Sequence, residues 1–274
     1  MFRGFYTVGS GMIAQQRRTE MLSNNIANAN TPGYKAEQST IRAFPDMLMS
    51  RLDSMRVPTE KGLNFRNLSE VGELSTGVYM QETLPLFAQG QLRETEQKTD
   101  IALLDGPMEV NEETGVAGTV FFTLEGENGG QFYTRNGNFA VNAEGYLTNP
   151  SGLYVLDDAG NRIELTSDDI RVTDSGAIFA GETEVATLGI AYSDSPDTLS
   201  KQDNGLFTTI DGNALPTGGT YSMQQGYLED SNVDAARSMT DMLTAYRAFE
   251  ANQKVLQAYD RSMEKAVNEV GRVN

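Results

Sequence analysis

The sequence predicts an α+β protein in which N- and C-terminal helices pair as an α-helical coiled coil around the ends of a central all-β domain of tandem hairpins. Apolar residues recur at three- and four-residue spacing at both ends of the 274-residue chain, whereas its middle alternates strand-like segments with glycine turns. Charge follows the same division, because residues 101–200 hold 17 acidic and 3 basic groups of a chain whose net charge is −17.

The first predicted element is a helix within residues 1–30. Its apolar stripe passes through Phe5, Met12, Leu22 and Ile26. Asparagines then disfavour the helix interior, and the triplet TPG at 31–33 forces a turn. The asparagine cluster consists of Asn24, Asn25, Asn28 and Asn30. Because amides both donate and accept, the cluster is expected either to bridge neighbouring subunits or simply to end the helix.

Residues 31–75 are predicted to form an extended linker segment, with Pro45, Pro58 and Gly62 interrupting short helical or extended pieces. The β domain follows at 76–228, where β-branched and aromatic residues recur in segments such as TVFFTL, QFYTRNGNFAV and EVATLGIAY. Turns are expected at 136–137, 143–145, 157–160 and 174–176, where the residues tolerate positive φ. Such closely spaced hairpins are typical of a sandwich or barrel.

The last predicted element, at 229–274, is a long helix opened by a capping box at Ser231 and Asp234 and running to about Val270. Its predicted seam includes Met242, Tyr246, Phe249, Leu256 and Met263. A long surface helix docked on its own domain explains this stripe, and so does pairing with the N-terminal helix followed by packing against other subunits. The length favours the second interpretation, because ordinary globular helices run ~8–20 residues.

Composition excludes several kinds of chemistry. The chain has no His, Cys or Trp, so a Ser-His-Asp triad, a thiol nucleophile, a disulfide and the usual zinc or haem ligands are all ruled out. We therefore predict no catalytic residues, no cofactor, no metal site and no small-molecule ligand. The negative charge disfavours nucleic acid and anionic membranes as partners. No apolar run is long enough for membrane insertion, and the amino terminus lacks the apolar stretch of a secretory signal.

Four short motifs have simpler interpretations. Asp174-Ser175-Gly176 resembles the loop of an aspartic protease, but a hairpin turn explains it equally well, and the chemistry needs a second carboxylate. The acidic turns at 157–161 and 203–205 lack the register of a calcium loop. Ser262 and Lys265 have an acyl-transfer spacing but fall on the outer face of the predicted helix.

Both ends of the chain carry a specific resemblance. The segments SGMIAQQRRTEMLSNNIANANTPGYK and QGYLEDSNVD, the latter followed by MTDMLTAYRAFEANQKVLQAYD, are similar to the terminal signatures of bacterial flagellar rod and hook proteins. FYTRNGNF and GYLTN also resemble the β domain of that family. The single β body looks more like a distal-rod-type member than a hook subunit. One departure is an interposed segment, Asp105 to Val120, which is acidic and expected to face outward.

The resemblance implies a structural subunit of the flagellar basal-body rod, outside the cytoplasmic membrane. It implies export by the flagellar type III apparatus and assembly with copies of the chain and paralogous subunits into a torque-transmitting helical tube. Its terminal helices would line the inner layer. The expected assembly residues are Phe5, Met12, Leu22, Asn25, Ile26, Asn28, Met242, Tyr246, Phe249, Leu256 and Met263. Alternatives are a secreted adhesin or cap-like binding module and an acid protease built on Asp174.

Overall fold

The computed structural model describes residues 2–56, 64–108, 110–111, 115–126, 130–165 and 167–270. It forms two compact units. Unit 1 comprises Met1–Ser23, Ser39–Thr83 and Ala236–Asn274, and unit 2 comprises Asn24–Gln38 and Leu84–Ala235. The chain therefore passes between the units four times, after residues 23, 38, 83 and 235.

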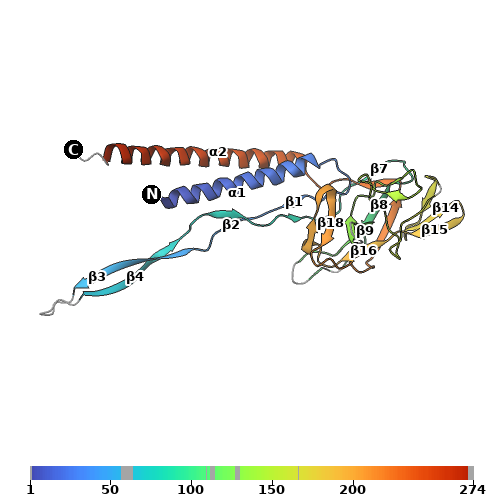
Figure 1. The fold of residues 1–274 in the computed structure, drawn as a ribbon, viewed down its shortest axis with the longest axis horizontal. Helices are drawn as coiled ribbons and strands as arrows, with labels where there is room; N and C mark the ends of the chain where they lie inside the picture. Colours follow the sequence, from blue (N-terminus) through green and yellow to red (C-terminus); the bar gives the residue numbers. More distant parts are fainter. Residues whose placement is uncertain are drawn as a thin grey trace. The chain divides into compact units, whose positions relative to one another are not determined.

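Long helices lie near both chain ends, as predicted. Helix α1 spans Phe2–Ala27 and α2 spans Ala235–Lys265, after which Ala266–Val270 forms a π-helical turn. Figure 1 shows the two helices side by side and running in opposite directions. With the β-rich body between them in sequence, the α+β class is confirmed. Within the described residues, neither helix is long and apolar enough to cross a membrane.

Twenty short strands lie between the helices in the part of the chain that the structure describes, and every strand pair they form is antiparallel. They are β1 (Glu37–Gln38), β2 (Ile41–Ala43), β3 (Met47–Arg56), β4 (Asn64–Leu74), β5 (Val78–Met80), β6 (Leu84–Pro85), β7 (Leu92–Glu94), β8 (Ile101–Asp105), β9 (Thr119–Glu125), β10 (Gln131–Thr134), β11 (Ala140–Val141), β12 (Leu147–Thr148), β13 (Ile170–Val172), β14 (Ala177–Ala180), β15 (Thr183–Thr187), β16 (Ile190–Ser193), β17 (Leu199–Lys201), β18 (Leu206–Thr209), β19 (Tyr221–Gln225) and β20 (Tyr227–Glu229). Short 3-10 turns occupy Pro196–Thr198 and Asp203–Gly205.

Unit 1 combines the helices with two strand pairs. Strands β3 and β4 form a two-stranded ribbon, and β2 pairs with β5 (Figure 1). The predicted short pieces of this region are therefore extended strands. Pro58 and Gly62, at which the sequence predicts interruptions, lie outside the described residues.

Unit 2 is built on a five-stranded sheet with the order β16-β9-β10-β18-β17. Side chains alternate across a strand, and β9 uses both faces. Phe122 joins the main core cluster with Ile101 and Phe139, whereas Phe121 joins a second cluster with Phe87 and Phe207. Strand β9 is therefore buried on both sides, which explains why two apolar residues, Phe121 and Phe122, follow each other where a half-buried strand would alternate with a polar residue.

The predicted turns use glycine in two different ways. Gly145, Gly160 and Gly176 have positive φ of 87°, 82° and 91°, as expected. Gly137 does not belong to the positive-φ residues of the described chain, so the tolerance of positive φ expected at 136–137 is not used. Glycine is needed there for space, because a Cβ would come well inside 3.0 Å of the carbonyl oxygen of Ile101.

The segment from Asp105 to Val120 is only partly described. Its acidic residues at 109, 112 and 113, on which the expected outward face depends, lie outside the described residues. Val110 bridges to Ala117, and Asn111 Nδ2 donates to Ser195 Oγ at 2.8 Å. Asp105 itself is the last residue of β8 and takes part in the ionic network described below.

Candidate assembly surfaces and a buried ionic network

The two helices approach each other closely where α1 carries glycine. A Cβ at Gly4 would lie 2.5 Å from Tyr259 Oη, and one at Gly11 would lie 3.2 Å from Asn252 Nδ2. The two glycines are seven residues apart on α1, and their contacts Tyr259 and Asn252 are seven residues apart on α2 in the opposite chain direction. The glycines thus form holes that receive larger side chains from α2 at a heptad step.

Further along the pair, an apolar cluster in unit 1 joins both helices to β5. Ala14, Met21 and Leu22 of α1 are buried together with Met80, and Met242 of α2 packs against them. This cluster is the apolar core of unit 1 among the described residues. Of the predicted seam residues, Leu22 and Met242 therefore contribute to contacts within one chain.

The inner face of α2 differs from the predicted seam at every second position. Met242, Phe249, Leu256 and Met263 are half-buried, as the seam predicts. The alternate inner positions are Ala245, Asn252 and Tyr259, which are buried or half-buried. Tyr246, which the predicted seam includes, is exposed, and so are Gln253 and Asp260, which continue the predicted repeat at steps of seven residues. The repeat is the same, but its second position lies one residue earlier, because small residues and glycine holes allow closer packing there.

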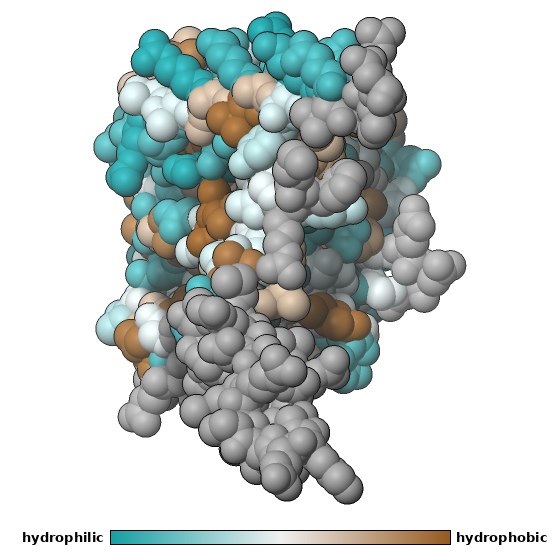
Figure 2. Space-filling model, turned by 90° about the vertical axis from the view of Figure 1, so that its left-hand side faces the viewer, coloured by the Kyte–Doolittle hydropathy of each residue, from teal (hydrophilic) through white to brown (hydrophobic). Residues whose placement is uncertain are grey.

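Large apolar side chains remain exposed on both helices. On α2 they lie one helical turn apart, at Met239 (56%), Leu243 (50%) and Tyr246 (53%). On α1 they include Tyr6 (70%) and Ile13 (57%). In the face displayed by Figure 2, apolar side chains interrupt the hydrophilic surface in several places. Within the part of the chain that the structure describes, both helices thus keep large apolar side chains exposed.

The remaining predicted assembly residues on α1 have mixed exposure. Met12 and Ile26 are half-buried, while Phe5 is 36% exposed. Asn25 is buried, and its amide forms a clamp on the following chain: Oδ1 accepts from the Glu37 N–H at 2.9 Å and from Tyr34 Oη at 3.2 Å. Its Nδ2 donates to the Glu37 carbonyl at 2.9 Å. Asn25 therefore fixes the turn after α1 within its own unit.

Asn28, the other asparagine predicted for assembly, makes local contacts at the end of α1. Its Nδ2 donates to Asn24 Oδ1 at 2.7 Å and to the Asn24 carbonyl at 2.9 Å. Its own side-chain oxygen accepts from Thr31 Oγ1 at 3.2 Å. The Asn24 carbonyl also accepts from the Asn28 backbone N–H at 3.1 Å, so these side-chain bonds reinforce the last turn of the helix.

A buried ionic network joins both signature segments to the β body. Glu229, on β20, accepts hydrogen bonds at both oxygens: Oε1 from Lys35 Nζ at 2.6 Å and from the Gly90 N–H at 2.7 Å, and Oε2 from Arg135 Nε at 3.1 Å. The Arg135 guanidinium also pairs with Asp105 Oδ1 at 2.7 Å. Two cations and two carboxylates thus balance inside unit 2.

Carbonyl groups complete the network. Arg135 donates to the carbonyls of Val120 at 2.8 Å and Leu103 at 3.0 Å, and Lys35 donates to that of Ala88 at 3.0 Å. Lys35, Arg135 and Glu229 have side chains at most 1% exposed, so water does not supply these bonds. Charge-assisted hydrogen bonds in such surroundings hold their geometry tightly.

Burial and the charges shift the pKa values of the network in defined directions. Burial alone would raise the pKa of Glu229, but Arg135, Lys35 and the hydrogen bonds from Lys35 and Gly90 together lower it. Burial lowers the pKa of Lys35, and the nearby Arg135 charge lowers it further. Burial also raises the pKa of Tyr34. The network is therefore sensitive to loss of any one charge.

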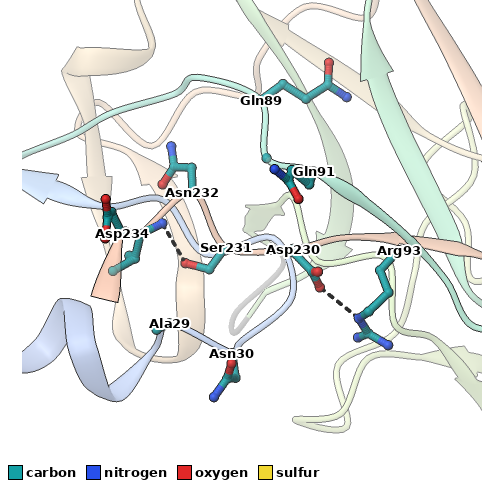
Figure 3. A pocket seen from close by; sticks show the side chains of 11 residues that line it. Ala29, Asn30, Gln89, Gln91, Arg93, Asp230, Ser231, Asn232 and Asp234 are labelled. Atoms are coloured by element: carbon teal, nitrogen blue, oxygen red, sulfur yellow. Dashed lines mark hydrogen bonds and ion pairs between the residues drawn. The ribbon is translucent and has the colours of Figure 1, made fainter. Parts of the chain in front are cut away.

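Beside this network lies an open pocket of about 750 Å³ in unit 2 (Figure 3). Asp230 forms an exposed ion pair with Arg93 on its rim, at 3.0 Å. Ser231 Oγ accepts from the Val233 N–H at 3.3 Å, and α2 starts only at Ala235. The predicted capping box at Ser231 is therefore wrong, because this serine closes a turn before the helix instead of capping its first turn.

The structure places the weaker motifs in turns and on a helix. Asp174 lies in the hairpin turn between β13 and β14, where its carbonyl accepts from the Met223 N–H at 3.0 Å. The Asp157 carboxylate accepts from its own turn, from the Asn161 N–H at 2.6 Å. No group of three acidic side chains close enough to hold a metal occurs among the described residues.

Sequence reasoning missed Lys35, Asp105, Arg135 and Glu229. Asp105, Arg135 and Glu229 are charged residues within or at the end of apolar, strand-like segments, as in QFYTR and GYLE, whereas Lys35 follows the TPG turn. A charge at such a place is a signal of a buried pair. The sequence did not show which charges meet, because the partners are 94 and 194 positions apart.

Comparison with known proteins matches the same three segments. Residues 5–35 match the family model "Flagella basal body rod protein", residues 115–180 match "Flagellar hook protein FlgE/F/G D1 domain", and residues 224–269 match "Flagellar basal body rod FlgEFG protein C-terminal". Lys35, Arg135 and Glu229 each lie in a different one of these segments. The network therefore joins all three.

Whole-length relatives give the same result. The chain is 42% identical over 278 residues to the flagellar hook-basal body complex protein FlhO of Bacillus subtilis (strain 168), which covers 100% of both chains. It is 31% identical to the flagellar basal-body rod protein FlgG of Agrobacterium fabrum, over 94% of this chain and 95% of that one. It is 28% identical to the flagellar basal-body rod protein FlgF of Caulobacter vibrioides, over 100% of both. The chain therefore belongs to the flagellar basal-body rod and hook-basal-body protein family.

Proposed function

We propose that this structural subunit of the flagellar basal body assembles, through its terminal helices, with copies of itself and with paralogous rod and hook subunits. The assembly is a helical tube that transmits torque. In it, residues 1–30 and 229–274 form the inner, helical layer, residues 76–228 form the outer body, and residues 31–75 connect them. Contacts between non-identical patches that do not close on themselves generate such a filament.

We infer that the helix pair is a coiled coil. The inner positions of α2 from Met242 to Met263 alternate at three and four residues, and glycines of α1 receive its side chains at a heptad step. Introduced cysteines test this pairing cleanly, since the chain has none of its own. A Gly11→Cys, Asn252→Cys chain should form an intramolecular disulfide, whereas Gly9→Cys, Asn252→Cys should not.

The observation that carries the assembly proposal is the exposed apolar side of α2. Met239, Leu243 and Tyr246 are half or more exposed, beside the inner side of the same helix that already packs within the chain. A helix whose apolar stripe is covered by its own domain is explained by that domain, but a stripe that extends beyond the covered part needs a second partner. Neighbouring copies of the same helices supply that partner in the proposed tube.

The test replaces Leu243 and Tyr246 together by serine, with Glu250→Gln on the exposed part of the same helix as the control. We expect the free energy of unfolding of the double variant to lie within about 1 kcal/mol of the wild-type value, because both side chains are exposed. It should be lost from purified hook-basal bodies, and swimming in soft agar should fail. Normal incorporation of the double variant would overturn the proposed interface.

We propose further that the chain reaches the rod through the flagellar type III export apparatus and has no catalytic site. Family membership supports export, and the absence of His and Cys from the sequence supports a non-enzymatic role. In cells whose flagellar export gate is disabled, an epitope-tagged chain should remain in the cytoplasmic fraction. Appearance of the tagged chain outside those cells would contradict this route.

A further inference from the structure

Glu229 is the shared counter-ion of two buried cations that precede it in the chain. Lys35 Nζ lies 2.6 Å from Oε1 and Arg135 Nη2 lies 3.0 Å from Oε2. All three side chains are at most 1% exposed. Charges at this depth are stable only while they are paired and hydrogen-bonded. A closed unit 2 therefore depends on the carboxylate of Glu229.

Loss of that carboxylate would affect the two cations unequally. Arg135 would retain Asp105 at 2.7 Å and two carbonyl acceptors. Lys35 would retain the carbonyl of Ala88 but lose the anion that faces it, while the positive charge of Arg135 stays nearby. The cost of closing the body without Glu229 therefore falls mainly on Lys35.

The segment that carries Glu229 also makes backbone contacts with earlier parts of unit 2. Its carbonyl accepts from the Gly33 N–H at 2.7 Å, and Glu229 pairs with Leu92 in the β20–β7 ladder. A Cβ at Gly90 would overlap the carbonyl oxygen of Asp230, so the two segments touch at backbone level. The segment around Glu229 thus contacts the backbone at Gly33 and at Gly90, and it approaches Gly90 so closely that a side chain there would collide with it.

The position of Glu229 in the chain gives this dependence a direction. It follows Lys35 by 194 positions and Arg135 by 94, and β20 is the last strand before α2. We propose that Glu229 is a folding interlock: unit 2 closes around Lys35 and Arg135 only after the last strand has delivered its carboxylate. A role of this interlock in delaying the closure of unit 2 during export rests on the proposed function, whereas the proposed order of folding is independent of that function.

The test measures refolding and unfolding rates of the purified full-length chain in urea, followed by near-ultraviolet circular dichroism of the buried Tyr34 and Tyr133. If Glu229 must be seated in the rate-limiting step, Glu229→Gln slows refolding by about 100-fold and changes the unfolding rate much less. The matched control is Asp230→Asn, which breaks the neighbouring exposed pair with Arg93 and should refold at nearly the wild-type rate.

A second variant separates charge from shape. Lys35→Met combined with Glu229→Gln removes the unpaired cation, so it should refold to within about tenfold of the wild-type rate. The interlock is overturned if Glu229→Gln refolds normally and only unfolds faster, because Glu229 would then merely stabilise the finished body. It is also overturned if the double variant is as slow as the single one or neither refolds. These rates do not depend on motility, so failure here is distinct from failure of the assembly proposal.

Discussion

Replacing Gly137 by alanine should destabilise unit 2, although the glycine does not need its conformational freedom. Its φ is not positive, so alanine suits the local backbone. The obstacle is space: an added Cβ would come well inside 3.0 Å of the Ile101 carbonyl oxygen and within 3.3 Å of Phe122 Cε2. Ile101 and Phe122 are 0% exposed, so neither can move aside into solvent.

Two losses set the magnitude. The Ile101 N–H donates to the Gly137 carbonyl at 3.0 Å, and pushing β8 away weakens this bond, a cost of about 1 kcal/mol. Forcing a methyl group into a filled core costs about 1–3 kcal/mol more. The expected loss is about 2–4 kcal/mol, which for a body of this size lowers the melting temperature by roughly 4–16 °C.

The assay is thermal unfolding monitored by near-ultraviolet circular dichroism, which reports on the buried Tyr133 of unit 2. Gly9→Ala is the control, because a Cβ there meets nothing within 4 Å and α1 should gain about 0.5–1 kcal/mol of helix propensity. A Gly137→Ala chain that melts together with the wild type would refute the argument that close approach, not φ, selects glycine at this position.

Three further results are expected. The pKa of Glu229 is lowered in the folded chain from its usual 4.5. The stabilising contribution of its carboxylate is therefore complete above pH 4.5 and is lost as the pH falls through the folded pKa. Urea midpoints measured across this range should fall less in the Lys35→Met, Glu229→Gln double variant than in the wild type. Asn25→Ala removes three hydrogen bonds of a buried amide and should cost about 2–3 kcal/mol in chemical unfolding, against less than about 0.5 kcal/mol for Ser23→Ala at an exposed position nearby. Phe122→Ala empties a site packed edge-on against Phe139 at 5.1 Å between ring centroids and should cost about 3–5 kcal/mol, and equal stability to wild type would show that the core can collapse around it.

The helices and the β-rich body were predictable because their patterns are local. Apolar spacing and turn residues act within a few positions of the chain, and they predicted α1, α2 and the strands of TVFFTL and QFYT. The inner face of α2 was predicted less well. Hydrophobicity favours Tyr246 over Ala245, yet the close approach of two helices favours the smaller side chain, and Ala245 is 2% exposed.

The ionic network could not be predicted, because its partners come from separate segments brought together only by the fold. Sequence reasoning located the segments that carry Lys35, Arg135 and Glu229 but assigned them no contact. Asn25 shows a related limit: its residue type indicated a helix end, whereas its burial and its two-way bond to Glu37 depend on the path of the chain beyond the turn. Residue type predicts bonding capacity, and tertiary structure decides its use.

The four chain passages between the units, after residues 23, 38, 83 and 235, have a mechanical consequence. Two bodies on a single tether can rotate about its bonds, since one strand of polypeptide offers almost no torsional resistance. With four connections, the same rotation has to wind the connecting segments around one another. Winding shortens the span of each segment, and the fixed contour length of the polypeptide limits how far the rotation can go. In a part proposed to carry rotation, connectivity alone thus removes the free swivel that a conventional two-domain linker would leave.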